Sequence, residues 1–322
     1  MSIKVRIGTK DDIDALVEVY CSDVMEWYHF TPKGRGDKAS YDELSILERV
    51  MQGGPWMDSD ALAKYWGDIE KLGIVTLIAE LQGKVVGHLD VIVSDELPLG
   101  RFLYLDVLIV HRDYRRKGIA TALIRQAEEL AREKGVSFMM VEPEQYEGPS
   151  GLTYRRCGFE RAFEACNLEV LVDAETVPSE VCLISVPQNM KAPVKTHAMV
   201  CGWYNISAKT WHYGVNPDLD HLRFFSCHEL ALSALTKDDV FFFHLQQDRN
   251  DHSAGSLVLW SPTSSVNSTE LQTIFKAAKA SASWLGIKKI TTKTLERYVN
   301  LLREVGWTET SKAQPYLTKV IS

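Results

Sequence analysis

The fold is decided by residues 107–123, which read Val-Leu-Ile-Val-His-Arg-Asp-Tyr-Arg-Arg-Lys-Gly-Ile-Ala-Thr-Ala-Leu. An apolar strand is followed by a short basic loop and then by an amphipathic helix. Gly118 and Ala120 leave the backbone N–H groups of the first helical turn open, and the helix dipole adds positive potential there. Arg115, Arg116 and Lys117 add further positive charge. The stretch predicts a binding site for a pyrophosphate, and the alternative is a basic loop that merely caps a helix.

The elements around this stretch predict an α+β fold with a mixed, mostly antiparallel sheet flanked by helices. Three consecutive strands form a meander, and one helical crossover then leads to a parallel strand. The expected strands are 3–7, 74–81, 85–93, 102–110, 137–142 and a last strand that follows Gly158-Phe159 and ends near Asp173. The expected helices are 13–20, 118–134 and 150–157, with a further excursion from 26 to 60 that contains a short helical piece at 41–51.

The second half of the chain repeats this order of elements in a weaker form. Val110 corresponds to Trp260, Gly135 to Gly286, and Gly158-Phe159 to Gly306-Trp307. We therefore expect one domain at residues 1–175, a linker region at 176–193 and a second, similar domain at 194–322. The loop 261–268 of the second domain contains no glycine and no cation. The second domain is thus expected to keep the scaffold without the phosphate site.

A second motif strengthens the interpretation of the first. Tyr154 stands four residues before Gly158-Phe159, on the helix that follows the next strand. Together with Arg115, Gly118 and Ala120 in the basic loop, this pattern resembles the GNAT superfamily of acetyl-CoA-dependent N-acetyltransferases. The resemblance covers residues 3–172 and implies the GNAT fold. The internal repeat is similar to tandem members of the superfamily that have one degenerate half.

The resemblance also implies roles for individual residues. Backbone groups of the strand would bind the pantetheine arm of acetyl-CoA, and backbone amides of the loop would hold the pyrophosphate. Tyr154 would protonate the departing thiolate, a transfer that a phenol within hydrogen-bond distance can make. The residues expected to bind the cosubstrate are Leu108, Ile109, Val110, Arg115, Arg116, Lys117, Gly118, Ile119, Ala120 and Thr121.

A protonated amine acceptor needs a base, which acts directly or through water. Asp106 lies on the same strand as Leu108, and Tyr104 shares its side of that strand; Glu142 ends the next strand. Each carboxylate could instead serve only in a salt bridge or a cap. In the excursion between 26 and 60, Trp27, Tyr28 and Trp56 are candidates for binding the acceptor. Their alternative role is packing of the excursion onto the sheet.

The composition narrows the class of partner and the compartment. The chain carries 36 Lys and Arg against 43 Asp and Glu, a net charge of −7. Clustered positive charge is what nucleic-acid binding requires, so no nucleic-acid partner is expected. The sequence shows no apolar run of roughly 18 residues, no secretory signal and no spacing typical of metal ligands. Six scattered cysteines indicate a reducing compartment, so we expect a cytoplasmic protein with no membrane partner and no metal.

These observations predict an enzyme that transfers an acetyl group from acetyl-CoA to a primary amine by direct attack in a ternary complex. The acceptor is a small-molecule amine or a peptide amine. The alternative is a CoA-binding pseudoenzyme that acts as a sensor or interaction module. The C-terminal domain is expected to help shape the acceptor site, or else to serve stability or homodimer formation.

Overall fold

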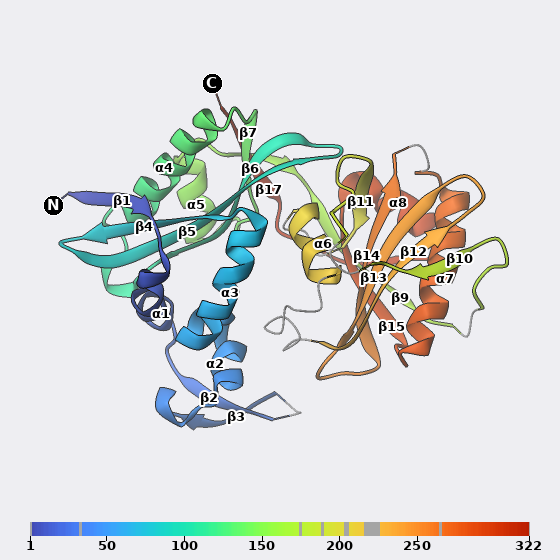
Figure 1. Cartoon of the computed structure of the whole chain (residues 1–322), viewed down its shortest axis with the longest axis horizontal. Helices are drawn as coiled ribbons and strands as arrows, with labels where there is room; N and C mark the ends of the chain where they lie inside the picture. Colours follow the sequence, from blue (N-terminus) through green and yellow to red (C-terminus); the bar gives the residue numbers. More distant parts are fainter. Residues whose placement is uncertain are drawn as a thin grey trace. The chain divides into compact units, whose positions relative to one another are not determined.

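The computed structural model describes residues 2–31, 34–173, 176–187, 190–202, 206–215, 226–263 and 266–321. The chain divides into two compact units. The first comprises Met1–Ser94, Arg101–Glu160 and Leu317–Ser322, and the second comprises Asp95–Gly100 and Arg161–Tyr316. Each unit contains one large twisted sheet with helices packed against it (Figure 1).

Most of the first unit is formed by a seven-stranded sheet with the strand order β1-β4-β5-β6-β7-β17-β8, of which the end of β5, the starts of β6 and β17 and most of β8 are grouped with the second unit. Neighbouring strands for which the register is known run antiparallel, except for the parallel pair β6 and β7. The expected meander and helical crossover are therefore confirmed. The strands are β1 (Ile3–Ile7), β4 (Val75–Leu81), β5 (Lys84–Glu96), β6 (Gly100–Val110), β7 (Phe138–Val141), β17 (Tyr316–Val320) and β8 (Glu160–Phe163).

Helices cover both faces of this sheet because side chains along each strand alternate between the faces. Leu89 of β5 belongs to the core formed with α4 (Ile119–Glu133) and α5 (Pro149–Arg156). Its neighbour His88 faces the other way and contacts Tyr20 of α1 (Ile13–Cys21). Gly87 lets α4 approach closely, since a Cβ there would lie 2.8 Å from the Cγ2 atom of Ile119.

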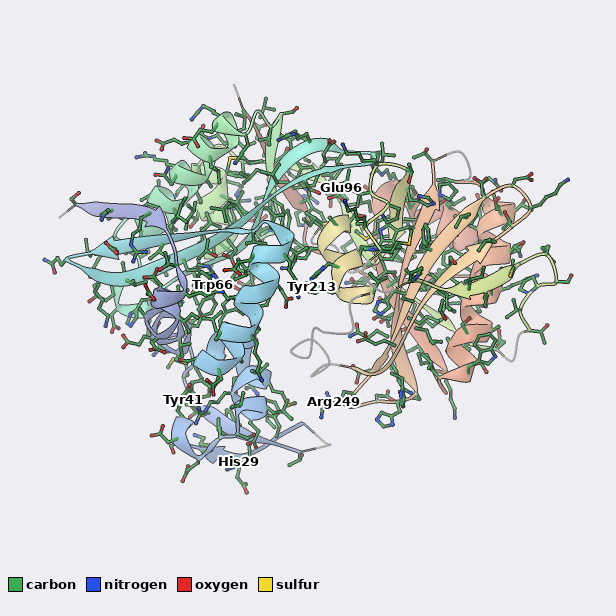
Figure 2. All side chains as sticks on the ribbon, viewed as in Figure 1. His29, Tyr41, Trp66, Glu96, Tyr213 and Arg249 are labelled. Carbon is green, nitrogen blue, oxygen red and sulfur yellow. The ribbon has the colours of Figure 1, made fainter. Side chains whose placement is uncertain are left out.

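The excursion after α1 has more regular structure than its turn residues suggest. A hairpin of β2 (Trp27–Thr31) and β3 (Gly34–Ala39) comes first; then follow the short helices η2 (Tyr41–Glu43), α2 (Ile46–Gly53) and η3 (Pro55–Met57) and the longer helix α3 (Ser59–Leu72). Ser45 caps α2, because its side chain accepts from the backbone of Glu48 while the Glu48 carboxylate accepts from the Ser45 backbone. Figure 2 labels His29 and Tyr41 on this segment. The hairpin was not predicted, since its strands lack apolar alternation.

The second unit repeats the arrangement, as the sequence predicts. Its sheet has the order β10-β12-β13-β14-β15-β9-β16, and β11 pairs with β14 off this path. β14 and β15 are parallel and flank the connection through α7 (Ser268–Trp284), as β6 and β7 do around α4. The other elements are β9 (Ala165–Leu171), β10 (Cys182–Ser185), β11 (His197–Cys201), α6 (Ser207–Val215), β12 (Ser226–Leu235), β13 (Val240–Asp248), β14 (Ala254–Pro262), β15 (Lys289–Leu295), α8 (Glu296–Glu304) and β16 (Thr308–Lys312).

The expected boundary at residue 175 is wrong, because the two units exchange their last strands. The single strand expected to end near Asp173 is divided into β8, in the first sheet, and β9, which pairs with β15 and β16 in the second. β17, at the C-terminal end of the chain, pairs with β7 in the first sheet. Leu168 is thus buried in the second core and Leu317 in the first. An alternating apolar pattern specifies which face of a strand is buried but not which sheet receives it.

Candidate active site

The central feature of the first unit is the point where β6 and β7 separate. Their parallel pairing joins Phe102–Tyr104 to Phe138–Met140. Residues 107–110 of β6, beyond the paired segment, line a cavity of about 520 Å³. The cavity extends to the start of α4 and is closed on another side by α5. An extended ligand could therefore lie along β6 and end at the helix N-terminus.

Most of the residues predicted to bind the cosubstrate line this cavity. Lys117 does not line the cavity. Its Nζ donates to the Asp113 carbonyl at 3.2 Å and lies over the Tyr114 ring. The cavity is also lined by residues that were not predicted. The predicted lining residues are Leu108, Ile109, Val110, Arg115, Arg116, Gly118, Ile119, Ala120, Thr121 and Tyr154; the others are Tyr20, Asp23, Val107, Glu144, Pro149, Ser150, Thr153 and Arg156.

The helix N-terminus is shaped to leave space in the cavity. Gly118 is the N-cap of α4 and has a φ of +84°, a conformation that favours glycine. A Cβ at this position would come no closer than 4.0 Å to a side chain, that of Ile3. Gly118 has no side chain that could cap the helix, so it leaves the N–H groups of the first turn to an anion.

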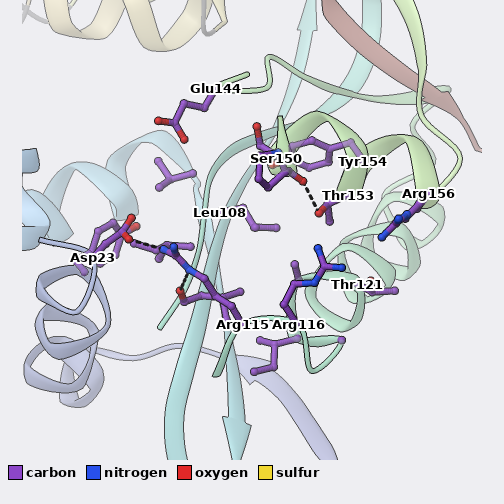
Figure 3. A pocket seen from close by; sticks show the side chains of 18 residues that line it. Asp23, Leu108, Arg115, Arg116, Thr121, Glu144, Ser150, Thr153, Tyr154 and Arg156 are labelled. Carbon is purple, nitrogen blue, oxygen red and sulfur yellow. Dashed lines mark hydrogen bonds and ion pairs between the residues drawn. The ribbon is translucent and has the colours of Figure 1, made fainter. Parts of the chain in front are cut away.

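Charge is distributed unequally around the cavity (Figure 3). Arg116 and Arg156 lie beside the start of α4, whereas Asp23 and Glu144 lie on the opposite side. Arg115 joins the two sides, because it forms an ion pair with Asp23 at 2.6 Å and donates to the Val110 carbonyl at 3.1 Å. One side therefore suits an anionic group and the other suits a cation.

Tyr154 lies in the wall formed by α5. Its side chain is buried and packs edge-on against Phe159, with the ring centroids 5.6 Å apart. Burial raises the pKa of the phenol, and Cys157 adds to this shift. The hydroxyl is therefore neutral over the physiological range and remains a proton donor. Its position in the cavity agrees with the role expected for it, which stays a prediction.

The two candidate carboxylates lie around Tyr104 rather than in the cavity wall. Burial raises the pKa of the Tyr104 phenol, and the charges of Asp106 and Glu142 raise it further. The structure thus brings Asp106 and Glu142 near Tyr104, and the role of either carboxylate as the base stays a prediction. Neither carboxylate lines the cavity; the acidic residues that line it are Asp23 and Glu144.

The three aromatic candidates for acceptor binding do not line the cavity. Trp27 packs edge-on against Tyr41, and the Tyr28 hydroxyl donates to Glu26, so both lie within the excursion. Trp56 is linked to the cavity indirectly, because its ring stacks on Tyr20 at 5.3 Å. Trp27 and Tyr28 therefore contact other residues of the excursion, and direct acceptor binding by the three stays a prediction.

Tyr20 and Asp23 bring the end of α1 to the cavity and were not predicted to do so. Tyr20 falls at the helical spacing of the core residues and was interpreted only as one of them. Asp23 lies in a polar stretch after the helix, and no motif or spacing in the sequence marks it as a site residue. Both are placed by the tertiary contact of α1 with the sheet, for which the sequence carries no local signal.

The corresponding place in the second unit is filled by the chain itself. β14 pairs with β15 at Ala254–Ser256, and at Leu259–Pro262 its free edge pairs with β11. Leu259–Pro262 lie as far along β14 from the start of its parallel pairing as residues 107–110 lie along β6. In the first unit these residues of β6 line the cavity. Two further bonds hold β11 against β15: Thr294 Oγ1 donates to the Val200 carbonyl at 2.6 Å, and the Gly202 amide donates to the Lys293 carbonyl at 2.8 Å.

Comparisons with known proteins agree with this architecture. Residues 41–159 match the model of the acetyltransferase (GNAT) family. A probable N-acetyltransferase family 8 member 5 from Mus musculus is 28% identical over 135 residues, which are 40% of this chain and 60% of that protein. The chain therefore spans less than two thirds of that relative.

Two solved structures resemble the whole chain. A GCN5-related N-acetyltransferase from Anabaena variabilis has a TM-score of 0.63 at 16% identity and is covered over 73% of its length. A tandem GNAT protein from the clavulanic acid biosynthesis pathway has a TM-score of 0.50 at 14% identity and is covered over 99%. Both alignments cover 100% of this chain. Residues 41–159 are thus similar to the GNAT family of acetyltransferases, and the fold of the chain resembles a tandem of two GNAT-like units.

No helix among the described residues is long and apolar enough to cross a membrane. They also contain no group of three or more His, Cys, Asp or Glu side chains arranged to hold a metal ion.

Proposed function

We propose that the first unit transfers an acetyl group from acetyl-CoA to a primary amine. The observation that carries this proposal is the cavity in which the open edge of β6, the uncapped N-terminus of α4 and the Tyr154 phenol meet. These three features supply, in one place, backbone groups for an extended arm, an anion site and a proton donor.

The residues of the cavity fit acetyl-CoA. The open space at Gly118 and the N–H groups of α4 suit a pyrophosphate, and Arg116 and Arg156 supply countercharge. Backbone groups of Leu108 to Val110 can pair with the amides of a pantetheine arm. When bound, acetyl-CoA supplies an acetyl group activated as a thioester.

Tyr154 is proposed as the general acid. Its buried phenol stays protonated and lies in the same water-poor wall as the expected path of the arm. An apolar environment raises the pKa of a thiol as well as that of a phenol. The raised pKa of Tyr154 therefore does not prevent it from protonating a thiolate in the same environment. A phenylalanine in its place would keep the packing against Phe159 and remove the proton.

The acceptor is proposed to be a cationic amine, either free or on a peptide. Glu144 supplies negative charge on the side of the cavity opposite Arg116 and Arg156, where Asp23 is held in an ion pair with Arg115. Asp106 and Glu142 add negative charge near Tyr104, outside the cavity lining. A carboxylate-lined end favours an ammonium group over a neutral or anionic acceptor.

The experiment that tests this function measures thiol release from acetyl-CoA with a series of primary amines and identifies the acetylated product by mass spectrometry. Tertiary and quaternary ammonium compounds of similar size serve as controls, because they carry the charge but cannot form an amide. We expect turnover with at least one primary amine and none with the controls. Tight CoA binding without turnover across amines and peptides would instead favour the pseudoenzyme.

A further inference from the structure

A buried chain of polar groups leads away from the cavity on the face of the sheet that α1 covers. The Tyr20 hydroxyl lies 2.7 Å from Nδ1 of His88, and Nε2 of His88 lies 2.9 Å from Oδ1 of Asp90. Thr76 Oγ1 donates to the same carboxylate oxygen at 2.7 Å. His88 is 1% exposed and Asp90 is fully buried. Polar groups at this depth are costly unless they are paired, so their alignment needs an explanation.

The chemistry of the groups fixes the direction of the hydrogen bonds. An ionised carboxylate only accepts, so Nε2 of His88 carries a proton and donates to Asp90. In the neutral imidazole Nδ1 is then the acceptor, and the Tyr20 hydroxyl donates to it. The hydrogen bonds therefore run from the Tyr20 phenol to the His88 imidazole and on to the Asp90 carboxylate. Nδ1 of His88, in the middle, carries no proton and is basic.

The Asp90 carboxylate, at the inner end of these hydrogen bonds, is suited to stabilise a positive charge on His88. Oδ2 of Asp90 is buried and has no hydrogen-bond partner among the residues that the structure describes. A buried carboxylate in this state is stabilised when a positive charge forms beside it. A proton on Nδ1 of His88 would create that charge 2.9 Å from Oδ1.

At the other end of these hydrogen bonds, Tyr20 reaches the cavity. Tyr20 lines the cavity together with Val107 and Leu108, whereas Asp106 and Glu142 do not. Stacking on Trp56, which in turn packs edge-on against Tyr65, holds the Tyr20 ring in place. Burial raises the pKa of the Tyr20 phenol well above its usual value, and the charges of Asp90 and Asp106 add to the shift. The phenol is thus a poor base by itself but can pass a proton on.

We propose that Tyr20, His88 and Asp90 form a proton relay that deprotonates the acceptor amine. The ammonium proton passes to the Tyr20 oxygen while the phenol proton passes to Nδ1 of His88. The products are a neutral amine, an unchanged phenol and an imidazolium paired with Asp90, so charge and protons balance. Tyr20 is the catalytic residue of the relay, and His88 and Asp90 act through it. The inference rests on the proposed function and names a base other than Asp106 or Glu142.

Among the described residues, charged and titratable groups near the relay lie on α1, β5 and β6. Tyr20 belongs to α1, Asp90 to the same strand as His88, and Asp106 to β6. On β4 the residue directly opposite His88 is the apolar Ile78, and Thr76 is the uncharged partner of Asp90. Asp90 lies against His88, whereas the charge of Asp106 acts on Tyr20.

The first test needs no activity. Nitrogen-15 NMR of the histidines in the full chain, with His88 assigned by His88→Gln, reports which ring nitrogen carries the proton. We expect neutral His88 to be protonated at Nε2 and free at Nδ1, and Tyr20→Phe to shift the Nδ1 resonance. A proton on Nδ1 of neutral His88 would make Tyr20 the acceptor and overturn the relay.

The second test compares pH profiles of acetyl transfer. Tyr20→Phe keeps the stacked ring and is expected to lower kcat about 10²-fold or more near neutral pH, with little change in the KM for acetyl-CoA. Its remaining rate should rise about tenfold per pH unit, because only amine already deprotonated in solution reacts. His88→Gln should behave in the same way.

The matched control is Tyr41→Phe, which also removes one phenol hydrogen bond, to the Met57 carbonyl at 3.0 Å, outside the cavity. It should keep the kcat and the pH profile of the unaltered chain. Acetyl transfer that is unchanged in Tyr20→Phe would overturn the relay alone. Absence of acetyl transfer by the unaltered chain would instead overturn the proposed function, and the NMR result would then still decide the direction of the hydrogen bonds.

Discussion

Thr294 Oγ1 donates a hydrogen bond to the carbonyl of Val200 at 2.6 Å, and this contact holds β11 in the gap beside β14. In the first unit the equivalent edge of β6 is open and lines the cavity. The difference between the two units is therefore larger than the loss of a glycine and cations in the loop 261–268. In the second unit β11 lies along the edge of β14 that the pantetheine arm of CoA would have to occupy.

We accordingly predict one acetyl-CoA site per chain. Pairing of β11 satisfies the backbone groups of Leu259–Pro262, so a ligand would have to displace four paired residues of the protein. Isothermal titration calorimetry of the whole chain should give a stoichiometry close to one. The same titration of Gly118→Glu should give no binding, whereas a residual site of similar affinity would show that the second unit also binds the cosubstrate.

Gly118→Glu should weaken acetyl-CoA binding at least about 100-fold, because its side chain fills the open space at the start of α4 and places a negative charge at the anion site. The matched control is Gly135→Glu. Gly135 also has positive φ, at +60°, and lies just past the other end of the same helix with nothing near its Cβ position. Both variants carry the same backbone strain, so equal loss of affinity in the two would mean that strain, and not the anion site, is responsible.

Much of the first unit could be predicted because its local signals agree. The basic loop, the glycine at the helix start and the tyrosine before Gly158-Phe159 are all short-range patterns, and each falls on the predicted element. The repeat in the second half could be predicted from the same order of elements. Glycines at helix ends, such as Gly135 and Gly286, marked the boundaries well, since positive φ favours that residue.

The features that could not be predicted depend on long-range pairing. The choice of β9 or β17 for a given sheet rests on contacts between residues more than a hundred positions apart, such as Leu317 with Val141. The position of Tyr20 at the cavity depends in the same way on its contact with His88, and the insertion of β11 on its pairing with β14. Periodicity specifies burial, but the partner is selected by the whole fold.

Tyr154→Phe should lower kcat by about 10² to 10⁴ while the affinity for acetyl-CoA changes little. The substitution removes a proton that is needed as the thiolate departs, and the ring can still pack against Phe159. Steady-state kinetics together with calorimetric titration of CoA separates the two effects. Tyr146→Phe is a suitable control, since it removes a phenol nearby that does not line the cavity. A kcat equal to that of the unaltered chain would return Tyr154 to a packing role.

The excursion after α1 should lose stability in acid because of Glu48. A backbone hydrogen bond from Ser45, followed by one from the His29 side chain, lowers the pKa of Glu48 from 4.5 to about 2. A carboxylate whose pKa is lower in the folded state stabilises that state fully above its unfolded pKa, and this contribution is lost as the pH falls through the folded pKa. The relevant window therefore runs from 4.5 down to about 2.

Glu48→Gln removes this ionisation while keeping a side chain that can accept from the Ser45 backbone. The free energy of unfolding of the variant should be lower than that of the unaltered chain near neutral pH, and the difference should shrink as the pH falls below 4.5. Denaturant unfolding of the two proteins at several pH values measures the difference. Glu43→Gln, which alters the similar carboxylate contact with Ser40, gives a comparison within the same segment. A difference that stays constant down to about pH 3 would contradict this account of how Glu48 holds α2.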